Sequence, residues 1–143
     1  MKTLNTLKFA TVLLATVALS ACSKKLKSDG CPPQMCTMEF ATVGVKFTDK
    51  AGSPVNVKQV KVENTRTNKA IVTQGAITGA DNAAGNYVVV TDSNKKEISS
   101  NGDDIKITAT TADGKTASAT IKVIGGCNCH VKRISGPETI VFE

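Results

Sequence analysis

The residues most able to do chemistry lie near the two ends of the chain. Cys31 and Cys36 lie near its start, and the run Cys127-Asn128-Cys129-His130 lies near its end. Thiols and an imidazole can form disulfides, bind a soft metal ion such as zinc, or take part in redox exchange. Which of these chemistries applies depends on the compartment in which the protein resides.

The start of the chain indicates that compartment. Lys2 and Lys8 precede an apolar run, residues 9–19, and the small pair Ser20-Ala21 separates this run from a fifth cysteine, Cys22. This order is that of a secretory signal peptide. The apolar run is shorter than the about 20 residues that a membrane-spanning helix needs. The chain is therefore expected to be exported.

The stretch Leu19-Ser20-Ala21-Cys22 resembles the lipobox of bacterial lipoproteins. The resemblance implies that residues 1–21 are a signal peptide, that the chain is cut before Cys22, and that Cys22 carries lipid. Residues 22–30 would then form a lipidated tether, and residues 31–143 one folded domain. Ser23-Lys24-Lys25 contains no acidic residue, which favours the outer membrane as the site of the anchor. An ordinary secretory signal that leaves Cys22 unmodified is the alternative.

In an exported chain the other four cysteines are expected to form two disulfides. A bond between Cys127 and Cys129 would close a strained ring, so both bonds are expected to join residues 31–36 to residues 127–129. Nested pairing suits antiparallel neighbours and is mildly favoured; it joins Cys31 to Cys129 and Cys36 to Cys127. Crossed pairing suits parallel neighbours and stays open.

The competing hypothesis is a metal-binding or thiol-redox site centred on Cys127-Asn128-Cys129-His130. Zinc sites usually have a C-x₂₋₄-C spacing and thioredoxin-type sites have C-x₂-C, whereas this run has C-x-C. The spacing matches neither pattern, so no metal and no other cofactor is expected. His130 is expected to be a surface residue of a strand.

No catalytic residue is expected, and the protein is predicted not to be an enzyme. His130 is the only histidine, so any Ser-His-Asp or Cys-His arrangement would have to use it, and no serine lies in a G-x-S-x-G motif. Asp103 and Asp104 follow Asn101-Gly102 directly. They are expected to form a solvated turn rather than a pair of catalytic carboxylates.

Charge and composition argue against some classes of partner. Loss of the signal peptide removes Lys2 and Lys8 and lowers the formal net charge from +6 to +4. Lys24, Lys25 and Lys27 then lie in the tether, where they could attract anionic lipid or keep the linker solvated. The rest of the chain is nearly balanced, so nucleic acid is not an expected partner. Four Phe, one Tyr and no Trp offer few aromatic faces for stacking on sugars.

The chemically active residues must be positioned by β-strands. From residue 38 onward, Val, Ile and Thr alternate with polar residues between turns of Gly, Asn and Asp, and no stretch keeps a helical repeat for three turns. We expect seven strands and a final edge segment, near 39–48, 55–66, 69–73, 86–92, 104–111, 116–124, 129–134 and 138–142. Changes of phase within the first two predict β-bulges near 41–42 and 58–59. This number of short strands predicts an all-β sandwich.

The clearest pair of expected strands is 104–111 with 116–124. A connecting loop of two residues would place Ile107, which belongs to the core face, opposite Thr120 on the solvent face. A loop of three residues, 112–114, places Ile107 opposite Ala119. The chain is therefore predicted to turn through three residues, with Gly114 in the left-handed region.

Two motifs resemble those of Ig-like domains on bacterial surface proteins, including domains similar to the carboxypeptidase regulatory domain. The first is Val45-Lys-Phe-Thr-Asp-Lys-Ala-Gly-Ser-Pro-Val55, a strand followed by a D-x-x-G-x-P-V turn. The second is Gly85-Asn-Tyr-Val-Val-Val90, a later strand. The resemblance implies an Ig-like antiparallel β-sandwich of about seven strands, noncatalytic and used for adhesion, presentation or assembly.

Together these features predict a lipid-anchored β-sandwich of the bacterial cell envelope that acts as a binding or structural module. Its expected partners are the membrane, through Cys22, and an envelope protein or a glycan. The contact surface is expected in two polar loops, residues 75–85 and 92–104. The metal-binding or thiol-redox site at residues 127–130 is the alternative function.

Overall fold

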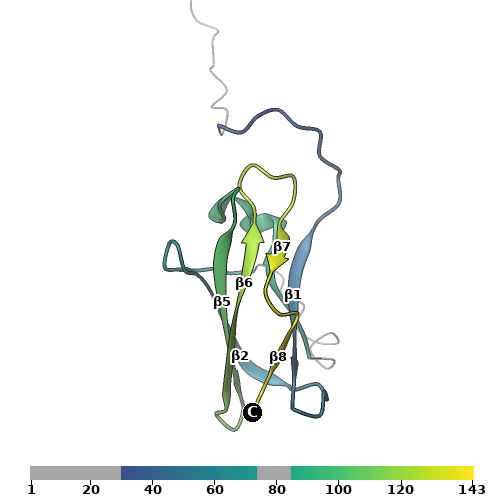
Figure 1. Cartoon of the computed structure of the whole chain (residues 1–143), viewed down its shortest axis with the longest axis vertical. Helices are drawn as coiled ribbons and strands as arrows, with labels where there is room; N and C mark the ends of the chain where they lie inside the picture. The colour runs from purple at the N-terminus through teal and green to yellow at the C-terminus, as the bar shows by residue number, and fades with distance from the viewer. Residues whose placement is uncertain (1–29, 74–84) are drawn as a thin grey trace, which may run out of the picture. The chain divides into compact units, whose positions relative to one another are not determined.

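The computed structural model describes residues 30–73 and 85–143. The signal peptide, Cys22, the tether lysines and most of the expected contact loop at 75–85 lie outside the described residues. The chain divides into two units, Met1–Cys31 and Pro32–Glu143. The described residues of the first unit are Gly30 and Cys31, and the described strands all belong to the second unit (Figure 1).

The second unit is an all-β fold, as expected. Its strands are β1 (Thr42–Thr48), β2 (Val57–Asn64), β3 (Lys69–Ala70), β4 (Asn86–Thr91), β5 (Asp103–Thr111), β6 (Thr116–Ile124), β7 (Lys132–Ser135) and β8 (Thr139–Val141). One sheet has the order β4-β1-β8 and the other β3-β2-β5-β6-β7. All paired strands are antiparallel except β1 and β8, which run parallel. The arrangement is an antiparallel β-sandwich.

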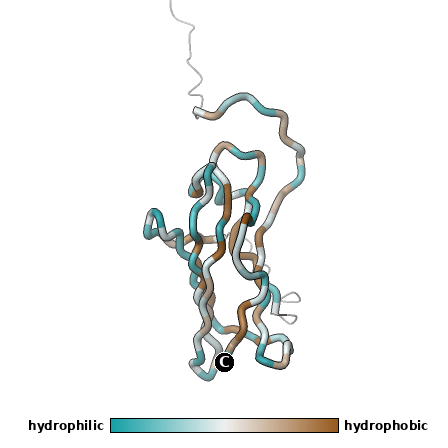
Figure 2. Tube along the Cα trace, viewed as in Figure 1, coloured by the Kyte–Doolittle hydropathy of each residue, from teal (hydrophilic) through white to brown (hydrophobic). Residues whose placement is uncertain are grey.

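The buried side chains of the two sheets form one apolar core. Alternate residues of β1 and β5 supply its centre, and Phe47, Ile105 and Ile107 are fully buried. The Phe47 ring packs edge-to-face against Tyr87 at 5.0 Å and against Phe142 at 6.1 Å between ring centroids. Burial of one such side chain contributes about 1.5–3 kcal/mol relative to its exposure. Figure 2 shows the corresponding hydrophobic stretches along the strands.

The hairpin between β5 and β6 has the predicted register. Ile107 lies opposite Ala119, and Ile105 lies opposite Ile121. The loop contains the three predicted residues, 112–114, and Gly114 has φ = 85°. Its N–H donates to the carbonyl of Thr111 at 3.1 Å. The predicted three-residue turn is therefore confirmed.

One of the two predicted bulges is confirmed and the other is misplaced. The register of β2 shifts between Val57 and Gln59, as predicted. The register of β1 shifts between Val43 and Gly44 rather than near 41–42. The apolar residues at 38 and 40 suggested the earlier position, but they precede β1 and are exposed. A β-carbon at Gly44 would lie 2.9 Å from the carbonyl oxygen of Tyr87, so this bulge requires glycine.

The two sequence motifs lie side by side in the fold. The Asp49 carboxylate accepts the N–H groups of Ala51 at 2.9 Å and Ser53 at 2.8 Å, which closes the turn after β1. The N–H of Phe47 donates to the carbonyl of Gly85 at 2.8 Å. A β-carbon at Gly85 would lie 2.6 Å from the carbonyl oxygen of Phe47. Glycine at this position therefore permits the close approach of the two motifs.

The segment 92–104, expected as a polar contact loop, is partly packed against the sandwich. It begins with the 3₁₀ helix η2 (Asp92–Glu97), which Thr91 caps by accepting the N–H of Ser93. Asn94 is buried and donates to the carbonyl of Val72 at 3.0 Å. Ile98 is buried in the core. Some polar side chains of this segment thus cap and fasten the backbone. Others are exposed, including Lys96, Ser100 and Asn101, so the expected contact surface stays a prediction.

Candidate functional site

The chemically active residues of the two chain ends meet beside the start of β1. A disulfide joins Cys36 to Cys129, with a Cα–Cα distance of 5.3 Å and a sequence separation of 93 residues. The side-chain amide of Gln34 donates to the carbonyl of Cys127. The hydroxyl of Thr37 lies 2.9 Å from Nε2 of His130. The contacts thus advance in the same direction along both segments.

This direction settles the pairing of Cys36. The nested pairing of Cys36 with Cys127, which suits antiparallel neighbours, is wrong, and the observed bond is that of the crossed scheme. Parallel neighbours bring Cys36 opposite Cys129 because both segments advance together. Cys31 and Cys127 each lie in a disulfide as well. All four cysteines are therefore oxidised, as predicted.

His130 connects Thr37 to Asp92 and is not a surface residue of a strand. It lies in the turn before β7, and 25% of its side chain is exposed. Its Nδ1 lies 2.7 Å from the Asp92 carboxylate, and its Nε2 lies 2.9 Å from the Thr37 hydroxyl. The expected position in a strand is wrong because the backbone here turns to reach Asp92. Both ring nitrogens are thus engaged.

The carboxylate of Asp92 is the centre of this cluster. It accepts the N–H of Ala41 at 2.9 Å and the N–H of Val131 at 2.8 Å. Burial acts to raise the pKa of Asp92, but the hydrogen bonds from Ala41, His130 and Val131 outweigh burial and hold the pKa below its ordinary value. We call the Cys36–Cys129 bond, the Thr37–His130 contact and the bonds to Asp92 the N-terminal clamp. The clamp fastens the chain before β1 to the chain before β7.

The order hydroxyl, imidazole, carboxylate in the clamp is that of a nucleophilic triad. With Nδ1 bonded to Asp92, a neutral His130 could accept the proton of Thr37 at Nε2. The Asp92 carboxylate also accepts the backbone N–H groups of Ala41 and Val131. These bonds hold two chain segments together, which is a structural role. Sequence reasoning missed the cluster because Thr37 is 93 residues and Asp92 is 38 residues from His130.

The prediction of a solvated turn at Asp103 is wrong, because its carboxylate is buried in a cluster with Arg66 and Asn64. Asp103 is 3% exposed and lies at the start of β5, so it is not in a solvated turn. Its carboxylate accepts two bonds from Arg66, at 2.6 and 2.9 Å, and one from Asn64 at 2.7 Å. The Arg66 guanidinium is the main cause that lowers the pKa of Asp103 to about 2, while Asn64 and the N–H of Ser99 assist against burial. The carboxylate is a structural anion.

Because of Asp103, the free energy of unfolding should decrease as the pH falls. The pKa of Asp103 is about 2 in the folded chain against an ordinary value of 3.8, so the unfolded chain binds the proton more tightly. About 2 kcal/mol of stability should be present above about pH 4 and lost as the pH falls towards 2. Denaturant unfolding of wild type, Asp103→Asn and the exposed neighbour variant Asp104→Asn from pH 2 to 5 measures it. Wild type and Asp104→Asn should share the acid loss; the same loss in Asp103→Asn would contradict the assignment.

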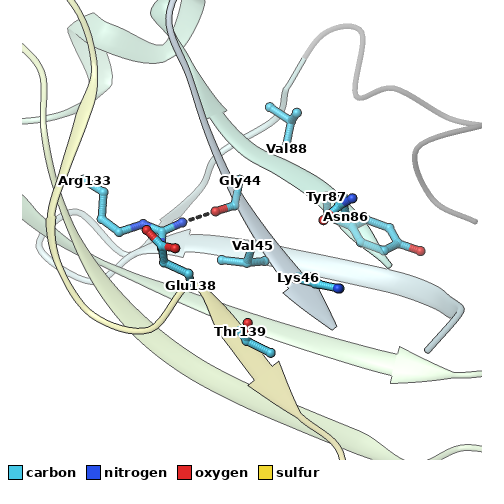
Figure 3. A pocket seen from close by; sticks show the side chains of 9 residues that line it. All are labelled: Gly44, Val45, Lys46, Asn86, Tyr87, Val88, Arg133, Glu138 and Thr139. Atoms are coloured by element: carbon cyan, nitrogen blue, oxygen red, sulfur yellow. Dashed lines mark hydrogen bonds and ion pairs between the residues drawn. The ribbon is translucent and has the colours of Figure 1, made fainter. Parts of the chain in front are cut away.

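A groove opens between β1, β4 and the turn before β8 (Figure 3). Its volume is about 490 Å³, and it is lined by Gly44, Val45, Lys46, Asn86, Tyr87, Val88, Arg133, Glu138 and Thr139. The Arg133 guanidinium donates to the carbonyls of Gly44 and, at 3.1 Å, Pro137, and lies 3.7 Å from the Glu138 carboxylate. The groove has the size of small-molecule sites. It carries both charges and hydrogen-bonding groups, and no motif in the sequence indicated it.

Metal binding at the C-terminal cysteines receives no geometric support. Among residues 30–73 and 85–143, no group of three or more His, Cys, Asp or Glu side chains is placed to hold a metal ion. In the disulfide state Cys129 offers no thiolate, which is the form that binds zinc. His130 has both nitrogens engaged by Thr37 and Asp92.

Comparisons with protein-family models, with curated proteins and with solved structures give no match to this chain. What the protein does must therefore be inferred from its sequence features and from the geometry of the described residues.

Proposed function

We propose that the protein is a lipid-anchored module of the bacterial cell envelope, in which an Ig-like β-sandwich, held by a tether from Cys22, binds or supports another envelope component. The observation that carries the proposal is the N-terminal clamp. It joins the first residues after the tether to the far end of the chain through a disulfide and side-chain hydrogen bonds. A domain held through its N-terminus benefits from such a covalent tie, because force on the tether then reaches the sandwich directly.

The module would contact its partner through the sandwich rather than through catalysis. The groove between β1, β4 and Arg133 offers a surface for a polar group of an envelope protein or a glycan. The metal-binding or thiol-redox function at residues 127–130 is less well supported, because Cys129 lies in a disulfide. Among the described residues, no helix is long and apolar enough to span a bilayer. We place the module at the outer membrane on the basis of the residues that follow Cys22.

Replacement of the anchor cysteine tests this proposal. Cys22→Ala should move the protein from the membrane fraction to the soluble fraction, because acyl chains contribute about 0.8 kcal/mol per buried CH₂ group. Ser23→Ala keeps the cysteine and should stay with the membrane. Cell fractionation with a high-salt wash measures the membrane association of both variants. Thermal melting checks that the domain remains folded in each. Retention of folded Cys22→Ala in the washed membrane would contradict the proposal.

A further inference from the structure

The chain between the tether and β1 exposes large apolar side chains. Met35 is 101% exposed, Met38 is 103% exposed and Phe40 is 63% exposed. We call residues 35–40 the apolar segment. It contains half of the exposed large hydrophobic residues found in the described chain; the others are Val72, Ile134 and Val141. Figure 2 shows hydrophobic residues along this stretch although it lies outside both sheets.

The apolar segment is fastened to the domain, so its exposure is not that of a loose end. Cys36 lies in its middle and is bonded to Cys129. Thr37 contacts His130, and the backbone of Ala41, just after the segment, donates to Asp92. The groups held against the sandwich are thus sulfur, hydroxyl and backbone, while the methionines and the phenylalanine face away. Met and Phe are usually buried, and exposed clusters of them mark interaction surfaces.

We propose that the apolar segment docks on the membrane to which Cys22 is attached, with Met35, Met38 and Phe40 in the boundary between headgroups and acyl chains. This inference rests on the proposed lipid anchor. Met35 lies thirteen positions after Cys22, and a chain of thirteen residues spans at most about 43–47 Å. The anchor therefore keeps the segment at high effective concentration beside the bilayer, and weak apolar contacts suffice to hold it there.

Charge supports a lipid surface as the occupant. Lys24, Lys25 and Lys27 lie in the tether, between Cys22 and the apolar segment, where cations are attracted to anionic headgroups. Glu39 is exposed between Met38 and Phe40 and would remain at the headgroup level. A shallow contact lets the tether lysines reach the anionic headgroups and keeps the Glu39 carboxylate out of the acyl chains. The N-terminal end of β1 would then face the membrane.

The absence of tryptophan from the chain allows a direct test. Met38→Trp and Phe40→Trp each introduce a single fluorophore into the apolar segment. Val141→Trp is the matched control, because Val141 is 47% exposed and pairs with Thr48 at the opposite end of β1. The lipidated full-length proteins are incorporated into vesicles of anionic lipid with or without brominated acyl chains. Flotation first establishes that each protein is anchored.

For the anchored proteins we expect brominated lipid to quench Met38→Trp and Phe40→Trp strongly and to shift their emission to shorter wavelength, with little effect on Val141→Trp. Anchored protein with equal, weak quenching at all three positions would overturn the docking inference and leave the proposed function intact. Failure of wild type to float would overturn the lipid anchor itself. A shift that depends on protein concentration without vesicles would show that a second copy covers the segment, which also overturns the inference.

Discussion

Reduction of all four domain cysteines should lower the free energy of unfolding by about 4–5 kcal/mol. The Cys36–Cys129 bond spans 93 residues, and in the chain-entropy model closure of such a loop restricts the unfolded chain by this amount. A domain of this size has a total stability of about 5–15 kcal/mol. The melting temperature should therefore fall by roughly 20 °C or more. Calorimetry with and without a thiol reductant measures the change.

The state and connectivity of the cysteines provide the control. Protein purified from the envelope should have no free thiol among these four cysteines and no bound zinc. Partial reduction with differential alkylation should identify Cys36 and Cys129 as partners. Only Asn128 separates Cys127 from Cys129, so peptide mapping alone cannot distinguish them. Free thiols together with stoichiometric zinc would contradict the clamp and favour the metal-binding alternative.

Truncation of the central aromatic residue should have the second-largest effect. Phe47 is fully buried and contacts the rings of Tyr87 and Phe142. Phe47→Ala should destabilise the domain by about 3–5 kcal/mol, because it removes apolar burial and leaves a cavity between the sheets. Denaturant unfolding of the purified domain measures this loss.

Phe40 offers a matched control for the same substitution. It is 63% exposed and lies before β1 rather than in the core. Phe40→Ala should change the stability by no more than about 0.5 kcal/mol. Similar losses for Phe40→Ala and Phe47→Ala would show that the chain before β1 packs into the sandwich, contrary to the structure.

The strands and the β5–β6 hairpin could be predicted because their signals are local. Alternation along β6 predicted its bounds, Thr116–Ile124, without error. The opposition of Ile107 and Ala119 followed from parity alone, since a shift by one residue would expose the core face. The start of β7 was predicted three residues too early, at 129, because residues 129–131 turn to meet Asp92.

The N-terminal clamp and the contacts of Asp103 with Arg66 and Asn64 could not be predicted, because they join residues that are distant in the sequence. Thr37, Asp92 and His130 are each ordinary polar residues in the sequence, and only the sandwich brings them together. Asp103 follows Asn101-Gly102, which is typical of a turn, yet it is buried and forms an ion pair with Arg66. The local sequence indicates a turn, but it does not show that the fold brings the positive charge of Arg66 to Asp103.

The measurement that tests the account most directly is mass spectrometry of the N-terminal peptide of protein isolated from the membrane. We expect the mature chain to begin at Cys22 and this residue to carry acyl groups. A mature chain that begins at another residue, or an unmodified Cys22, would contradict the lipid anchor.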